Sequence, residues 1–186
     1  MINFISKVLT FYLPRKYRKQ ARCHIKNYIY GYKIFLRAKY IGENFILGRY
    51  SSVNKNTYIG HDVRFNGVFI EGMGKVVIGN YCQFGKDITI ISSNHDYDNG
   101  DKIPYGEQTV FKPVEIGDCV WVGSRVTILP GTKIGEGAII QGGAVVHGEI
   151  PPCRIAGGNP AKVFKYRDKE HYQRLKEARK FLINTD

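Results

Sequence analysis

The chain has 186 residues, enough for one domain with short appendages, and its 43% hydrophobic share is ordinary for a soluble protein. The net charge of +12 would fit a nucleic-acid-binding protein, but that charge is unevenly distributed. Residues 1–42 hold ten basic residues and no acidic one. Residues 43–160 hold ten basic and twelve acidic residues, and residues 161–186 hold eight basic and four acidic residues. The positive charge therefore lies on two terminal arms, typical of solvated or interaction surfaces, and nucleic acid is not expected as a partner.

Residues 1–40 are expected to form a basic arm of one or two helices. Apolar residues recur at helical spacing from Ile25 to Leu36, and an apolar run before them is interrupted by Lys7 and stopped by Pro14. That run is too short and too broken for a signal peptide or a membrane-spanning helix. The arm is expected to pack on the body or on a neighbouring subunit; the alternative is peripheral contact with an anionic membrane surface.

Residues 41–165 carry an internal repeat of six residues. Apolar side chains fall at intervals of six in three runs: Ile41, Leu47, Val53, Ile59 and Phe65; Ile78, Phe84 and Ile90; and Ile116, Val122, Ile128, Ile134, Ile140 and Val146. Gly often follows the apolar position and is expected to permit a close turn. A period of six fits a short strand plus a corner, so three units close a triangular coil and coils stack about 4.8 Å apart. The repeat predicts an all-β fold, a parallel β-helix.

The repeat is interrupted at two places. One extra residue between Phe65 and Ile78 predicts a small bulge near Gly67–Gly74. A longer break gives a polar, turn-rich excursion over residues 91–115, which is predicted to leave the coil. Long excursions from a regular scaffold often carry function, and the imidazole of His95 in this one can take a proton from an alcohol.

The C-terminal end differs in character. The segment from Pro151-Pro152 to Pro160 is expected to be the exit from the coil, because proline cannot continue a regular ladder. Residues 166–186 are predicted to form an amphipathic helix. This helix and the N-terminal arm are expected to cover the two open ends of the stack.

Cysteine and histidine usage points away from disulfides and metals. The four cysteines, Cys23, Cys82, Cys119 and Cys153, lie far apart without zinc spacing, which is typical of reduced thiols in a cytoplasmic protein. No pair of histidines has a metal-ligand spacing, so no metal is expected. Trp121, the only tryptophan, occupies an outward-facing phase of the repeat and suggests a ligand surface or a subunit-packing surface.

Three segments together resemble the hexapeptide-repeat acyltransferases, and most of all the maltose, galactoside and nodulation-type sugar O-acetyltransferases. They are Asn94-His95, the stretch Ile116-Gly117-Asp118-Cys119-Val120-Trp121-Val122-Gly123-Ser124, and Pro151-Pro152 with Ala156-Gly157-Gly158-Asn159-Pro160-Ala161-Lys162. The resemblance covers residues 41–165. It implies a left-handed parallel β-helix, an exception to the usual right-handed crossover. It also implies a homotrimer that binds acetyl-CoA between neighbouring coils, with active sites at the subunit interfaces.

The resemblance also assigns roles to residues. The family's catalytic histidine falls on His95, its substrate-contacting asparagine on Asn66, its active-site tryptophan on Trp121, and its oxyanion-binding backbone N–H on Ser124. Positions that contact the coenzyme fall on Trp121, Ser124, Gly142, His147, Gly148, Lys162 and Lys165. His95 is then expected to deprotonate a saccharide hydroxyl as it attacks the thioester carbon. Two departures matter: Gly148 stands where the sugar enzymes often carry a basic residue, and their N-terminal acceptor-capping segment is not recognisable.

Other functions are compatible with parts of the sequence. A streptogramin-type xenobiotic acetyltransferase and an amino-sugar N-acetyltransferase would use the same scaffold. A γ-class carbonic anhydrase would need a third histidine beside His61 and His95, and position 100 is Gly. A non-catalytic scaffold whose basic arms bind a membrane or a polyanion is the last alternative. The basic N-terminal arm slightly favours an acceptor near the inner face of a membrane, as in cell-surface polysaccharide synthesis.

Overall fold

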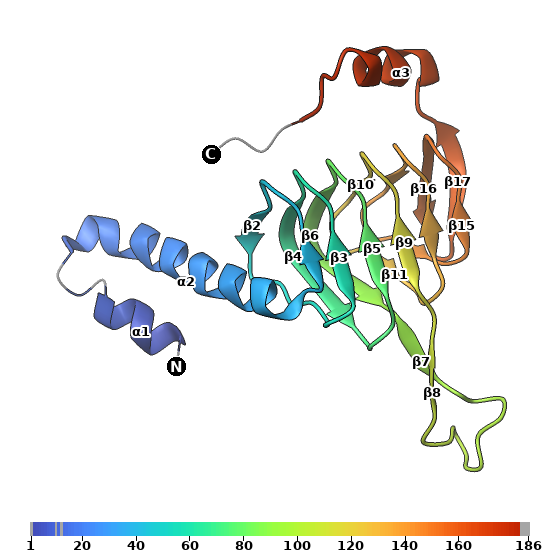
Figure 1. The fold of residues 1–186 in the computed structure, drawn as a ribbon, viewed down its shortest axis with the longest axis horizontal. Coiled ribbons are helices and arrows are strands. Elements are labelled where there is room, and N and C mark those ends of the chain that lie inside the picture. Colours follow the sequence, from blue (N-terminus) through green and yellow to red (C-terminus); the bar gives the residue numbers. More distant parts are fainter. Residues whose placement is uncertain (1, 10, 12, 183–186) are drawn as a thin grey trace.

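The computed structural model describes residues 2–9, 11 and 13–182, and its body is a stack of short parallel strands (Figure 1). A helical hairpin of α1 (Ile2–Leu9) and α2 (Arg15–Arg37) precedes the stack, and α3 (Lys169–Glu177) follows it. The first face of the stack holds β1 (Tyr40–Ile41), β3 (Thr57–Ile59), β5 (Val76–Ile78), β9 (Val114–Ile116), β12 (Lys133–Ile134) and β15 (Glu149–Ile150). The predicted β-helix with helical ends is confirmed.

Two further faces share one sheet, because two long strands bend across the corner between them. Strands β4 (Arg64–Glu71) and β6 (Gln83–Ile91) bend in this way, and β6 pairs with β10 at one end and with β11 at the other. The second face consists of β2 (Ile46–Arg49), the first halves of β4 and β6, β10 (Trp121–Val122), β13 (Ile139–Ile140) and β16 (Arg154–Gly158). The third face consists of the second halves of β4 and β6 with β11 (Thr127–Ile128) and β14 (Val145–Val146).

The in-phase apolar residues form the core of the stack. Val122 lies opposite Ile140 in the next coil, and Ile116 lies opposite Ile134, so one coil is three repeats long. From Val53 to Val146 every in-phase apolar side chain of the three runs is at most 3% exposed. Neighbouring coils therefore bury one another's apolar face, and no single unit could do so alone.

The glycines of the repeat serve close packing between coils. A Cβ on Gly123 would lie 2.5 Å from the backbone nitrogen of Gly142 in the next coil. The positive φ needed at the corner belongs instead to the residue three places after the apolar position, such as Tyr81, Cys119 or Gly137. The expectation that the glycine directly after the apolar residue supplies the turn is therefore wrong. That position is glycine because the next coil leaves no room for a side chain.

Both interruptions of the repeat lie where they were predicted. The register of β4 against β6 shifts beside Asn66, and a turn follows at Gly72–Gly74, with φ +78° at Gly72. The longer excursion forms a hairpin arm of two antiparallel strands, β7 (Ser93–His95) and β8 (Thr109–Phe111), which projects from the body (Figure 1). We call residues 93–111 the hairpin arm.

The C-terminal end corrects two expectations. The ladder does not stop at Pro151-Pro152, because both prolines lie in a corner where a missing N–H costs no ladder hydrogen bond, and β16 continues parallel to β13. The chain leaves the coil only after β16, and β17 (Ala161–Tyr166) returns antiparallel beside it. Since β17 already covers the last edge, α3 lies along a corner of the coils and not over the open end, and it ends at Glu177.

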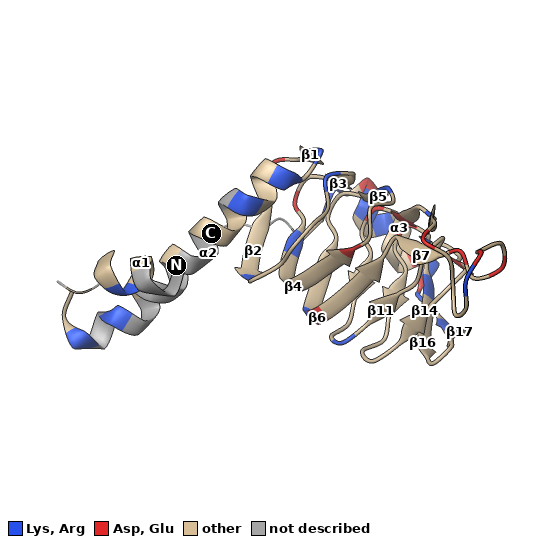
Figure 2. Cartoon of the chain, turned by 90° about the horizontal axis from the view of Figure 1, so that it is seen from below, with Lys and Arg blue, Asp and Glu red and all other residues tan. Residues whose placement is uncertain are grey.

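Among the described residues, the N-terminal hairpin contacts the body through the end of α2. Ile34 is 2% exposed, and the Tyr30 ring lies 4.4 Å from that of Tyr50. Figures 1 and 2 show α1 and the start of α2 pointing away from the coils, with basic residues along α2. Of the expected packing, the structure therefore shows only that of the end of α2 on the body, and packing of the rest of the arm on a neighbouring subunit stays a prediction. In the described part of the chain, no helix combines the length and apolar character needed to cross a membrane.

Candidate active site

Trp121 stands on the outer surface of the second face, as its phase in the repeat predicts. Its side chain is 57% exposed, and it lies between Gln83 of β6 and Ile139 of β13 in the ladder. The following residue, Val122, is fully buried, so the alternation of β10 fixes the outward direction of the indole. A large exposed ring on a rigid strand is well placed to contact a ligand.

Ser124 lies at the corner that follows Trp121. Its hydroxyl accepts a hydrogen bond from the backbone N–H of Lys86 at 3.0 Å, and its carbonyl accepts one from Gly143 at 2.9 Å. Within the described residues, the backbone N–H of Ser124 has no acceptor. Gly142 stands at the matching place in the next coil, where a Cβ would come within 3.1 Å of the Ser124 carbonyl. This corner therefore presents one free backbone donor in a rigid, crowded setting.

Asn66 occupies the same corner toward the N-terminal end of the stack. It follows the buried Phe65 as Gly123 follows Val122, two coils away, which corresponds to about 9–10 Å at the normal strand spacing. Its side-chain amide donates to the carbonyl of Phe84 at 3.0 Å, so the half-buried side chain is held in place. Asn66, Trp121 and Ser124 thus lie on one side of one chain.

His95 lies elsewhere, at the base of the hairpin arm. Its ring is exposed and stacks on Tyr105, with centroids 3.8 Å apart and planes 13° from parallel. The backbone N–H of His95 donates to the side chain of Asn94 at 3.0 Å. The arm leaves the stack at the corner between the third and first faces, whereas Ser124 lies between the second and third. A single chain therefore does not bring His95 to Trp121, Asn66 or Ser124.

The positions assigned to the coenzyme are spread over the C-terminal coils. Gly142 lies beside Ser124, whereas the exposed His147 and Gly148 lie at the following corner. Lys162 and Lys165 are exposed on β17, opposite Gly157 and Ile155 of β16. One chain does not gather them into one cleft.

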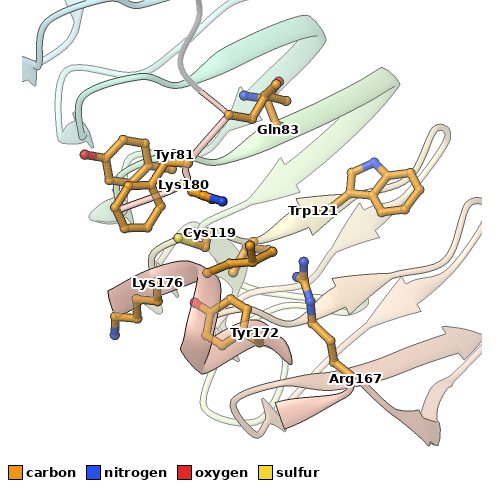
Figure 3. A pocket seen from close by; sticks show the side chains of 12 residues that line it. Tyr81, Gln83, Cys119, Trp121, Arg167, Tyr172, Lys176 and Lys180 are labelled. Carbon is orange, nitrogen blue, oxygen red and sulfur yellow. The ribbon is translucent and has the colours of Figure 1, made fainter. Parts of the chain in front are cut away.

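A cleft that the sequence did not predict lies between the second face and the chain that follows β17. We call residues 167–182 the C-terminal strap. The cleft has a volume of about 350 Å³, and Figure 3 shows the side chains that line it. It is lined by Tyr81, Gln83, Cys119, Val120, Trp121, Arg167, Tyr172, Leu175, Lys176, Lys180, Phe181 and Leu182. Trp121 is the one predicted site residue in this wall.

The strap is fixed by polar contacts around Glu136. Tyr172 donates to the Glu136 carboxylate at 2.8 Å, and Lys176 does so at 2.5 Å. Burial acts to raise the pKa of Glu136, but these two hydrogen bonds outweigh it and leave that pKa below its usual value. Burial, together with the bond to Glu136, raises the pKa of Tyr172, so its phenol stays protonated. The ring of Tyr172 packs over Gly137, where a Cβ would come within 2.8 Å of it.

The end of the strap is held by aromatic stacking. The rings of Phe181 and Tyr81 lie 4.1 Å apart and only 8° from parallel. Arg167, at the other end, donates to the carbonyl of Gly137 at 3.2 Å and lies 5.0 Å from the centre of the Tyr172 ring. Tyr81 and Phe181 are a hundred residues apart and belong to no common period, so the sequence carried no signal that joins them.

No cluster of three or more His, Cys, Asp or Glu side chains suited to a metal ion occurs among the described residues. His61 pairs with Asp62, with Nδ1 and the carboxylate oxygen 2.8 Å apart, and packs edge-on against Tyr81. Cys82, Cys119 and Cys153 are free thiols, and burial raises the pKa of Cys82 to about 12. The side chain of Cys23 lies outside the described residues.

Comparisons with known proteins agree with this geometry. Residues 113–148 match the family model of the bacterial transferase hexapeptide (six repeats). A chloramphenicol acetyltransferase of Escherichia coli is 30% identical over 76% of this chain and 83% of that protein. The galactoside O-acetyltransferase of Escherichia coli is 33% identical over 66% of this chain, which spans 62% of that protein.

The fold also matches a solved structure. A hexapeptide-repeat acetyltransferase of Vibrio cholerae, complexed with acetyl coenzyme A, has a TM-score of 0.61 and 20% identity, covering 90% of this chain and 88% of that one. This likeness confirms the predicted left-handed parallel β-helix. From its repeat, its coils and its relatives, the chain belongs to the hexapeptide-repeat acyltransferase family.

Proposed function

We propose that the protein is an acetyl-CoA-dependent O-acetyltransferase that modifies a saccharide hydroxyl. The observation that carries the proposal is the free backbone N–H of Ser124, held at a rigid corner beside the exposed Trp121. A preorganised donor of this kind stabilises the negative charge that develops on a thioester oxygen, an effect of about 3 kcal/mol in comparable sites. The relatives named as galactoside and maltose O-acetyltransferases support a saccharide acceptor.

The reaction is direct transfer of the acetyl group. The neutral imidazole of His95 takes the proton of the acceptor hydroxyl while that oxygen bonds to the thioester carbon. The carbon–sulfur bond then breaks, and the CoA thiolate recovers the proton from His95. Trp121 and Asn66 orient the reactants, Gly142, His147 and Gly148 line the coenzyme path, and Lys162 and Lys165 attract the CoA phosphates.

The active site is proposed to need two copies of the chain, in a homotrimer. His95 is separated from Trp121 and Ser124 within one chain, so the hairpin arm has to reach a neighbour. The arm also carries large apolar side chains that its own body leaves uncovered, with Ile103 99% exposed and Phe111 57% exposed. Contact with a neighbouring copy would bury them.

An acetyl-CoA consumption screen tests this function. Neutral sugars, amino sugars, nucleotide sugars and chloramphenicol are offered in parallel, and the product of each positive reaction is tested for hydroxylamine lability, which O-esters show and amides do not. Acetylation of a saccharide hydroxyl supports the proposal. Turnover only on an amino group, or only on the antibiotic, would replace it with the amino-sugar or the xenobiotic alternative. The relative named as a chloramphenicol acetyltransferase favours the xenobiotic alternative.

We also propose that the N-terminal hairpin rests on an anionic membrane surface, near cell-surface polysaccharide synthesis. Val8, Leu9 and Phe11 are between 52% and 64% exposed, in a segment that has basic residues and no acid. Apolar side chains beside basic ones suit the interface of an anionic bilayer. Phe11→Glu should reduce co-sedimentation with phosphatidylglycerol vesicles, while Met73→Glu on the body should not. Equal sedimentation of both variants with the wild type would reject the proposal.

A further inference from the structure

The C-terminal strap closes one side of the face that carries Trp121. It starts at Arg167 beside the coil of Gly137 and reaches Tyr81 two coils away. Tyr81, Cys119 and Gly137 hold the same corner position in successive coils, so the strap runs along the stack. The N-terminal hairpin points away from this cleft, so within the described chain it is the strap that stands beside Trp121.

The cleft under the strap combines aromatic rings with positive charge. Trp121, Tyr172 and the stacked pair of Tyr81 and Phe181 supply flat apolar surfaces of the kind on which sugar rings stack (Figure 3). A volume of about 350 Å³ falls within the usual range of small-molecule sites.

The charge of this cleft is unbalanced. Arg167, Lys176 and Lys180 line it, and among the described lining residues there is no Asp or Glu. Lys176 is neutralised by Glu136. Among the described residues, the Arg167 side chain contacts only a backbone carbonyl and the Tyr172 ring, and the Lys180 side chain has no partner. Within the part of the chain that the structure describes, two cations therefore remain without a counter-charge beside the rings, and they suit a ligand that carries an anion.

We propose that this cleft is the acceptor subsite and that it selects an anionic saccharide, one that bears a carboxylate or a phosphate group. The assignment rests on the proposed function, since it needs Trp121 to be shared by the acetyl-transfer site and the acceptor. The sugar ring stacks against the aromatic wall, and Arg167 and Lys180 bind its anionic group. The strap then determines specificity, while the coils supply the transfer chemistry.

The single tryptophan gives a direct measurement. Trp121 fluorescence of the full-length protein is titrated with glucuronate, glucose 1-phosphate and glucose, and separately with CoA. Saturable changes are expected with the two anionic sugars, and glucose should bind about tenfold more weakly. Glucuronate and glucose 1-phosphate distinguish a carboxylate from a phosphate requirement. Glucose equal to both, or no change with either anion, would overturn the proposal.

Two variants separate recognition from folding. Lys180→Gln removes an exposed cation whose side chain has no partner in the described part of the chain, so the variant should fold normally. It should bind both anionic sugars about tenfold more weakly and bind glucose and CoA as the wild type does. Lys169→Gln, on α3 but outside this cleft, should change nothing. If Lys180→Gln weakens CoA instead, the cleft binds the coenzyme. If it dissociates the oligomer, Lys180 pairs with the acidic hairpin arm of a neighbour. Either result overturns the proposal of an anionic acceptor subsite. The proposed function itself would be rejected if no acceptor were acetylated in the acetyl-CoA consumption screen.

Discussion

Mixing two inactive variants would reveal whether one active site is built by two chains. His95→Ala removes the proposed general base from the hairpin arm, and Trp121→Ala removes the indole from the second face. Both side chains are exposed, so neither change opens a cavity in the core. His95→Ala alone should lower kcat by a factor on the order of 10²–10⁴.

The expected recovery follows from the geometry. If each site of a trimer combines His95 of one copy with Trp121 of the next, every mixed trimer holds one site with both residues intact. Random mixing of equal amounts places both variants in three of every four trimers. With one intact site of three in each of these, about one quarter of the wild-type rate should return. The two variants are unfolded together, refolded, checked for trimer content by light scattering and assayed for acetyl-CoA consumption. A mixed trimer population with no recovered activity would refute a site shared between chains.

Three further predictions concern stability and reactivity. Gly123→Ala should lower the melting temperature by several degrees, because its methyl would lie 2.5 Å from the backbone of the next coil, whereas Gly31→Ala, with open space around it, should not. The folded-state pKa of Glu136 is lowered, so its contribution to stability is present above its unfolded pKa and lost as pH falls through the folded value. Melting curves from pH 7 to about pH 3 should therefore converge for wild type and Glu136→Gln; a constant difference would contradict this. Cys82, with a pKa of about 12, should react with Ellman's reagent only after denaturation, and rapid reaction in the native protein would be incompatible with its burial.

The fold was predictable because one short-range rule generates it. Apolar residues at every sixth position can all be buried if the chain forms coils that stack on one another. Val122 and Ile140 lie opposite each other in successive coils, as this stacking requires. The reason for the glycines was not predictable in the same way. Both a tight turn and close packing favour glycine. Only the structure shows that Gly123 is needed because the neighbouring coil leaves no room for a side chain, while Arg125 adopts the positive φ of the turn.

The candidate site was predictable only where the repeat, or its interruption, determines whether a side chain or segment points out of the coil. The outward phase of Trp121 followed from the period, and the excursion that carries His95 followed from its interruption. The C-terminal strap was not predictable, because the stacking of Phe181 on Tyr81 joins residues with no common pattern. Amphipathicity indicated a helix near Tyr172, but it could not tell whether that helix covers an end of the stack or a corner.

The proposed mechanism depends most on His95 as the general base. The most direct test measures kcat of His95→Ala with an identified acceptor, alongside the affinity of the same protein for CoA, with His171→Ala on α3 as the matched control. If His95 is the general base, kcat should fall by a factor on the order of 10²–10⁴, with CoA affinity and melting temperature unchanged. Wild-type turnover by His95→Ala would contradict the proposed mechanism.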